Sequence, residues 1–158
     1  MEDPAPISAH DAPTAGCTAN RIPEGSIPEG FKPHFRHSPL TDPWEPLYSR
    51  KTDTAIILGL HVARQHTNAR GMAHGGLISA LADNAMGLSC VAQFPEPRSL
   101  LTVNLALDFI GIAKLGQWLQ FETNFTKIGS TLCFAHACIT ADGKICAQAR
   151  ATFRTVGD

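Results

Sequence analysis

Hydrophobic and polar residues alternate along the last third of the chain in four successive segments, near residues 102–109, 119–125, 131–141 and 144–154. A period of two is typical of strands that cover a core with one face and meet solvent with the other. Between the last two segments lies Asp142-Gly143. This dipeptide favours a tight hairpin, because both central residues of a type I′ turn need positive φ.

The same alternation predicts which side chains face the core. Asp108 and Glu122 are expected to point away from it. The side chains expected on the core-facing side are Val103, Leu105, Leu107, Phe109, Leu119, Phe121, Phe125, Ile145, Ala147, Ala149, Ala151 and Phe153.

A strand and a long helix precede these four segments. Residues 54–63 favour a strand, and residues 75–93 contain helix formers up to the point where Pro95 and Pro97 end the helix. Long hairpins with one apolar face must cover something, and this helix is the only candidate. We therefore predict an α+β fold in which an antiparallel sheet of five to six strands wraps around one long helix.

The predicted helix has an apolar stripe and a second, uncharged face with a single acid. Asp83 falls on the second face, and no other charged residue lies between Gly75 and Gln93. Its expected neighbours are Ser79, Ala80, Met86 and Gly87, while the stripe comprises Leu77, Ile78, Leu81, Ala82, Ala85, Leu88 and Ala92. Asp83 is either an ordinary solvated acid or a covered carboxylate with a function.

The start of this helix offers backbone donors. His74 precedes Gly75 and Gly76, and the first amides of a helix have no partner within it. Together with the helix dipole they stabilise negative charge, and glycine lets a carbonyl group come close. The glycine pair is equally compatible with a plain tight turn.

Gly75 and Asp83 are too far apart to act on one small group within the same chain. They are eight residues apart, which is about 12 Å at 1.5 Å per residue. If both act on one carbonyl, they must come from different subunits, so the spacing predicts a dimer with shared sites.

Composition places the chain among ordinary soluble proteins. It has 158 residues, 44% hydrophobic and 17% charged, with a net charge of −1. No basic stripe suited to nucleic acid is present, and no apolar run is long enough to span a membrane or to form a secretory signal. The odd cysteine count without a C-x-x-C pair argues against disulfides and zinc, so we expect a reducing, cytoplasmic location.

The first part of the chain differs from the rest. Nine of the eleven prolines lie between Pro4 and Pro46. We divide the chain into a Pro-rich leader, residues 1–45, and a folded domain, residues 46–158. Residues 1–22 are expected to be disordered or loosely attached, and the following aromatic residues are expected to pack on the domain surface.

Residues 66–87 carry a motif of known type. They include the pattern N-x-x-G-x-x-H-G-G, from Asn68 through Gly71 and His74 to Gly76, and Asp83 lies nine residues after the histidine. This segment closely resembles the signature of PaaI-like hot-dog-fold acyl-CoA thioesterases. The order of strands also matches that family from about residue 46 to 156.

The resemblance implies a role for each matched residue. Asp83 would be the general base or the nucleophile, and the Gly75 N–H would bind the oxyanion. His74 would hold the loop or polarise the carbonyl group, and Asn68 would position water or the thioester, although the two residues could instead cap the helix and stabilise a turn. Thr102 would lie near the acid, with Leu101 as the alternative under a one-residue shift.

The implied function is hydrolysis of an acyl-CoA, with coenzyme A as part of the substrate and no metal or prosthetic group. The family implies a homodimer, often paired into a tetramer. Two rival functions stay open at this point: enoyl-thioester hydration or dehydration, and acyl-CoA binding without catalysis. Charge and position make four residues candidates for contact with CoA phosphates: Arg70, Lys127, Arg150 and Arg154.

Overall fold

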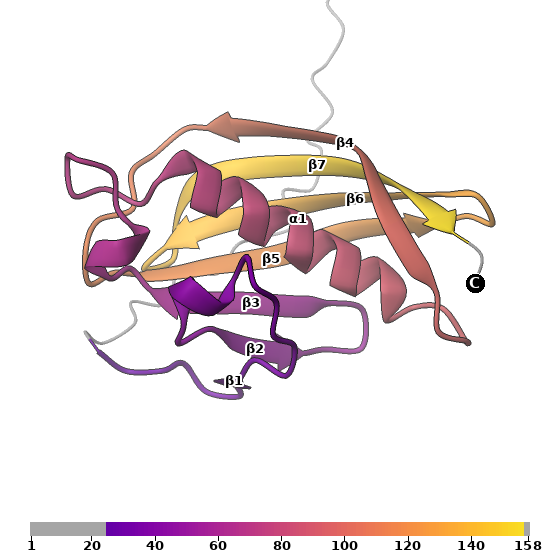
Figure 1. Cartoon of the computed structure of the whole chain (residues 1–158), viewed down its shortest axis with the longest axis horizontal. Helices are drawn as coiled ribbons and strands as arrows, with labels where there is room; N and C mark the ends of the chain where they lie inside the picture. Colours follow the sequence, from indigo (N-terminus) through magenta and orange to yellow (C-terminus); the bar gives the residue numbers. More distant parts are fainter. Residues whose placement is uncertain (1–24, 157–158) are drawn as a thin grey trace, which may run out of the picture.

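The computed structural model describes residues 25–156, which form one curved antiparallel sheet of seven strands around one α-helix (Figure 1). The sheet order is β1-β2-β3-β5-β6-β7-β4. The elements in chain order are β1 (Lys32–Pro33), η1 (Asp42–Trp44), β2 (Tyr48–Lys51), β3 (Ile56–His61), η2 (Arg64–His66), α1 (Gly75–Val91), β4 (Ser99–Phe109), β5 (Trp118–Ile128), β6 (Leu132–Ala141) and β7 (Lys144–Val156).

This arrangement confirms the predicted α+β hot-dog fold. Helix α1 begins at Gly75 as predicted and ends at Val91, two residues earlier than predicted, with Ala92 as its cap. Within residues 25–156, no helix is long and apolar enough to cross a membrane. The sheet has one strand more than the upper predicted number of six, because two leader residues form β1 and pair with β2.

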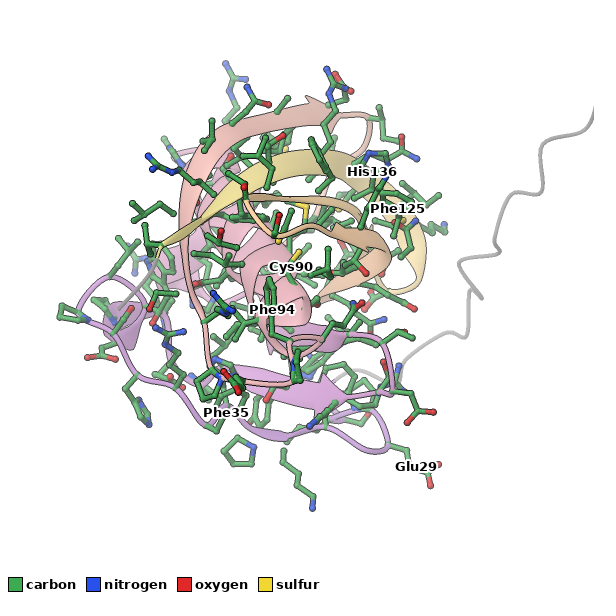
Figure 2. All side chains as sticks on the ribbon, turned by 90° about the vertical axis from the view of Figure 1, so that its right-hand side faces the viewer. Glu29, Phe35, Cys90, Phe94, Phe125 and His136 are labelled. Atoms are coloured by element: carbon green, nitrogen blue, oxygen red, sulfur yellow. The ribbon has the colours of Figure 1, made fainter. Side chains whose placement is uncertain are left out.

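The core lies between α1 and the concave face of the sheet. Leu81, Ala82 and Ala85 from the helix are fully buried, and Leu58 and Phe121 from the sheet meet them there. Figure 2 looks along the helix and shows the sheet curving around it, with Cys90 inside the curve. The curvature explains why the buried arc of α1 is wider than one stripe.

Met86 shows the effect of this wider arc. It was expected beside Asp83 on the second face, but its side chain is fully buried in the core. A sheet that wraps around a helix covers more of its circumference than a flat sheet does. The face left open carries the partly exposed residues Ala80, Asp83, Asn84 and Gly87.

Three irregularities in strand pairing correct the predicted alternation. Register shifts lie between Thr102 and Asn104, between Thr123 and Phe125, and between Ile139 and Thr140. A bulge inserts one residue and reverses which face the following side chains point to. Three predicted core residues at or beside these bulges, Val103, Phe125 and Ile145, are exposed by about half, and Phe109 is 55% exposed at the end of β4.

Phe125 illustrates the reversal. Leu119 and Phe121 point into the core as predicted, whereas Phe125 lies beyond the bulge and is 47% exposed. Its ring stacks at 5.0 Å from that of His136 on the neighbouring strand (Figure 2). The hairpin prediction is confirmed, since Asp142 and Gly143 have φ of 46° and 79°.

The described part of the leader packs against the sheet. Phe31 is buried and its ring contacts that of Trp118 at 5.1 Å, edge to face. Gly59 makes room for this tryptophan, because a Cβ at position 59 would clash with the Trp118 ring. Phe35, in contrast, is 66% exposed. The expectation for residues 1–22 lies outside the described residues, and the domain boundary at residue 46 stays a prediction.

Strand β4 lies at an edge of the sheet. In the described part of the chain it pairs with β7 along its length and has no partner on its other side. Figure 1 shows it passing over α1 along the top of the molecule. The edge strand and the open face of the helix are thus next to each other.

Candidate active site

Asp83 lies on the open face of α1, where β4 passes closest to it. The Thr102 hydroxyl donates a hydrogen bond of 2.9 Å to Asp83 Oδ1. Burial raises the pKa of Asp83 above its usual value, and the hydrogen bond from Thr102 opposes this shift. A carboxylate with a raised pKa holds a proton more tightly, which improves it as a general base.

The hydrogen bond places Thr102, and not Leu101, beside the acid. Leu101 is 59% exposed, and the register shift after Thr102 turns the strand at this point. Thr102 of β4 pairs with Phe153 of β7, so the sheet fixes the position of Thr102 relative to the helix.

His74 and Gly75 form the start of α1. His74 is the N-cap, and its Nδ1 accepts a hydrogen bond of 2.9 Å from the Gly76 N–H. Because Nδ1 is an acceptor, the proton of the neutral ring is on Nε2. His74 can therefore cap the helix through Nδ1 and donate to a substrate through its Nε2–H.

Gly75 is the first residue of the helix, so its N–H has no partner within α1. A Cβ at position 75 would lie 3.3 Å from the Phe109 ring. Because glycine has no Cβ, a substrate group can approach this N–H closely.

Asn68 shapes the loop that leads into the helix. Its Oδ1 accepts hydrogen bonds from the backbone of Arg70, at 2.9 Å, and of Met72, at 3.3 Å. Gly71 takes the positive φ of 73° that this turn requires. The turn interpretation of Asn68 therefore has direct support, and its part in catalysis stays a prediction.

His66 matched no motif, and the structure gives it a structural role. The buried ring accepts a hydrogen bond from the Ala63 N–H through Nδ1 and donates through Nε2 to the Trp44 carbonyl, both at 2.9 Å. Burial lowers its pKa, which keeps the ring neutral. His66 thereby ties the leader to the loop that precedes α1.

Within one chain, these residues form two separate groups. Asp83 and Thr102 meet at the middle of the helix, while Asn68, His74 and Gly75 lie at or before its start. Eight residues of α1 separate the acid from Gly75, about 12 Å along the axis. One chain therefore does not bring the predicted base and the predicted oxyanion donor together.

A cavity of about 350 Å³ adjoins Asp83 and extends toward the end of the helix. The described residues that line it come from α1, from β4 and β7, and from the leader: His34, Arg36, Ser38, Thr41, Leu47, Asp83, Asn84, Gly87, Leu88, Val91, Arg98, Ser99, Leu100, Thr102 and Phe153. The sequence alone did not indicate the leader residues in this set. Their signal was weak, because four polar or charged residues in a Pro-rich segment match no motif.

Three of the four basic candidates for CoA lie at neighbouring positions on one face of the sheet, with Lys127 two strands away from the β7 segment that holds Arg150 and Arg154. Arg70 is exposed in the loop before α1. Lys127, Arg150 and Arg154 are exposed on β5 and β7, and Arg150 lies 3.9 Å from Asp108. Their contact with CoA stays a prediction.

The buried cysteines are poorly suited to nucleophilic chemistry. Burial raises the pKa of Cys90 to about 12 and that of Cys146 to about 11. Cys133 and Cys138 are also buried and free of disulfides. Among residues 25–156, no cluster of three or more histidine, cysteine or acidic side chains could hold a metal ion.

A hot-dog domain with a half-buried carboxylate on its helix and free amides at the helix start defines a class of enzyme that acts on acyl groups. Residues 70–147 match the model of the thioesterase superfamily. The chain is 37% identical over 129 residues to a putative esterase of Pseudomonas aeruginosa, covering 81% of this chain and 96% of that protein. The chain therefore belongs to the thioesterase superfamily.

Two further similarities agree. Human acyl-coenzyme A thioesterase 13 is 35% identical over 101 residues, which cover 61% of this chain and 70% of that protein. A thioesterase of Streptococcus pneumoniae, solved with coenzyme A, has a similar fold, with a TM-score of 0.64 and 24% identity over 73% of this chain and 92% of that one. The resemblance to PaaI-like hot-dog thioesterases is thus confirmed.

Proposed function

We propose that this protein hydrolyses acyl-CoA thioesters to a free acid and CoA, at sites that two copies of the chain share. As a member of the thioesterase superfamily, the chain is a thioester hydrolase. A relative named as an acyl-coenzyme A thioesterase and a structural neighbour solved with coenzyme A support acyl-CoA as the substrate. CoA enters as part of that substrate.

The observation that carries the shared site is the separation of Asp83 from Gly75 along one rigid helix. A tetrahedral intermediate is small, and its oxyanion needs donors about 2.7–3.1 Å away. A base about 12 Å from the donor cannot serve the same carbonyl carbon. A second copy with its helix alongside in the opposite direction would bring its Gly75 to Asp83.

The edge strand supports this association. Strand β4 has an unpaired side in the described part of the chain, and Leu101 and Val103 on it are 59% and 60% exposed. Unpaired edges with exposed apolar side chains favour pairing with another strand. Pairing of two β4 strands would continue the sheet across a homodimer and place the two open helix faces together. A dimer of such dimers stays a prediction, as does cytoplasmic location.

The chemistry of hydrolysis then follows from the residues. Asp83 removes a proton from water as the water oxygen bonds to the thioester carbon, and the carbonyl oxygen gains the negative charge. The Gly75 N–H of the other copy donates to that oxygen, at the positive end of the helix dipole. When the carbon–sulfur bond breaks, Asp83 returns the proton to the CoA sulfur.

The alternative route uses Asp83 as the nucleophile. Its oxygen bonds to the thioester carbon, CoA leaves as the thiolate, and water cleaves the resulting anhydride. Both routes need the same carboxylate and the same oxyanion donor. Thr102, His74 and Asn68 have supporting roles in either route: orienting Asp83, donating from Nε2, and holding the loop before the helix.

A panel of fatty-acyl-CoA and aryl-acyl-CoA substrates, read by release of free thiol, tests the activity. Complementation between two inactive variants tests whether two subunits share each active site. Asp83→Asn and Gly75→Pro chains carrying different affinity tags are co-expressed, and the hybrid is purified through both tags.

A shared site predicts that one of the two sites in each hybrid dimer is intact, so activity returns to about half of the wild-type value while both parent variants stay inactive. Sites built within single chains would give a hybrid as inactive as its parents. That result would end the shared-site proposal and leave thioester hydrolysis standing.

A further inference from the structure

The cavity beside Asp83 has a defined length and two chemically different ends. Asp83 and Val91 both line it and are eight residues apart on α1, about 12 Å at the helical rise. Thr102 and Arg98 both line it and are four residues apart at the start of β4, about 13 Å at the rise of a strand. The two estimates agree, so the cavity extends from the acid to Arg98.

Part of the cavity wall is apolar. Leu88 from the helix, Leu100 from β4 and Phe153 from β7 line it, with Leu47 on the side of the leader. Gly87 is one turn beyond Asp83 on the same open face and carries no side chain into this space. A chain of methylene groups fits such walls.

The cavity also carries cationic side chains. Arg98 and Arg36 line it, and Asp83 is the only acidic residue among the described residues that do so. Neither arginine lies within 4.0 Å of a carboxylate in residues 25–156, although Arg98 stacks over the Phe94 ring at 6.0 Å. Two arginine side chains at the cavity are therefore available to an anion.

We propose that this cavity binds the acyl group of the substrate and that Arg98 and Arg36 select acyl chains that end in a carboxylate. The inference rests on the proposed function, because it takes Asp83 as the point at which the thioester lies. Guanidinium groups bind carboxylates with charge-assisted hydrogen bonds, often two in parallel.

The same substrate carries a second source of negative charge, the phosphates of CoA. Both anions have the chemistry that an arginine pair recognises. If the arginines bind a carboxylate on the acyl group, their replacement changes the selectivity between acyl chains. If the arginines bind the CoA phosphates instead, their replacement lowers kcat/KM equally for every CoA thioester.

The experiment compares suberyl-CoA with octanoyl-CoA, which have the same chain length and differ by the terminal carboxylate. The ratio of their kcat/KM values is measured for the wild type and for Arg98→Gln, Arg36→Gln and the double variant. Arg64→Gln is the matched control, because Arg64 is exposed and is not among the residues that line the cavity. The same pair of acyl groups is also tested on N-acetylcysteamine, a thiol without phosphates.

We expect the wild type to prefer suberyl-CoA by at least about tenfold, as a hydrogen bond to a charged group typically provides. The preference should persist on N-acetylcysteamine and disappear in the double variant, while Arg64→Gln keeps it. A wild type without this preference, or variants that lose activity equally on both CoA substrates, would overturn the inference. Failure to hydrolyse any acyl-CoA would instead contradict the proposed function.

Discussion

The two halves of the proposed site on helix α1 differ in kind, since one uses a backbone group and the other a side chain. At the start of the helix, the functional groups are backbone: the Gly75 N–H, positioned by a capped turn in which His74 accepts from Gly76. At the middle of the helix, the functional group is a side chain, Asp83, positioned by Thr102 from β4. One half is fixed by local sequence, and the other by a residue 19 positions away.

The electrostatics of the two halves also differ. The helix dipole acts mainly within the first turn, so it favours negative charge near Gly75 and has little effect two turns later. Asp83 instead experiences burial, which raises its pKa. The rigid helix therefore keeps an anion-stabilising end and a basic carboxylate apart, and in the proposed homodimer a second copy brings them to one substrate.

Removal of the carboxylate should have the largest effect. Asp83→Asn keeps the shape and the hydrogen bond from Thr102 but cannot accept a proton, so we expect kcat/KM for thiol release to fall about 10²–10⁴-fold. Asp53→Asn is the matched control, since Asp53 is exposed in the turn between β2 and β3. Near-normal turnover by Asp83→Asn would remove Asp83 from the mechanism.

Asp83→Asn should lower activity but leave the stability of the fold unchanged or raise it. The pKa of Asp83 is higher in the folded than in the unfolded chain, so its ionised form favours unfolding at pH values above the unfolded pKa. The free energy of unfolding of Asp83→Asn at neutral pH should therefore be equal to or above that of the wild type. Thermal melting measures this and separates lost catalysis from lost folding.

Removal of the backbone donor should have the next largest effect. Gly75→Pro deletes one N–H at the first helical position, where proline is tolerated, and we expect a loss of about 10²–10³-fold in kcat. Gly75→Ala adds a Cβ at the same 3.3 Å from Phe109 but keeps the N–H. If alanine and proline reduce kcat equally, steric change is responsible and the oxyanion role is wrong.

Loss of the Thr102 hydroxyl should have the smallest effect on rate and a clear effect on pH dependence. The hydroxyl stabilises the ionised carboxylate, so Thr102→Val should raise the pKa of Asp83 further. The acidic limb of the profile of kcat/KM against pH should move to higher pH, with less than about a tenfold change at the plateau. Thr102→Ser should keep the wild-type profile, and a Thr102→Val limb that stays in place would argue against this pairing.

Much of the fold was predictable because it depends on local periodicity. The helix start, the Asp142-Gly143 turn and the order of strands each follow from short segments of sequence. The orientation of Phe125 and Ile145 was not, because each lies beside a bulge, and an extra residue in one strand leaves no mark in the hydrophobic pattern. Burial of Met86 likewise depends on the curvature of the whole sheet.

The candidate site divides in the same way. The motif from Asn68 to Asp83 is contiguous, so sequence alone suggested those residues. Contact between Thr102 and Asp83 needed the register of β4, which a one-residue shift would have changed. The cavity residues Arg36 and Arg98 lie 62 positions apart and meet the same space only because the leader folds back over the helix.

The unpaired side of β4 has a consequence for how activity and stability depend on protein concentration. If the proposed homodimer forms through β4, a newly made copy exposes free backbone groups and apolar side chains until another copy covers them, and other proteins could pair with the same edge. Association by mass action then determines both turnover and resistance to unfolding. We expect dilution to lower the activity per chain and the melting temperature together.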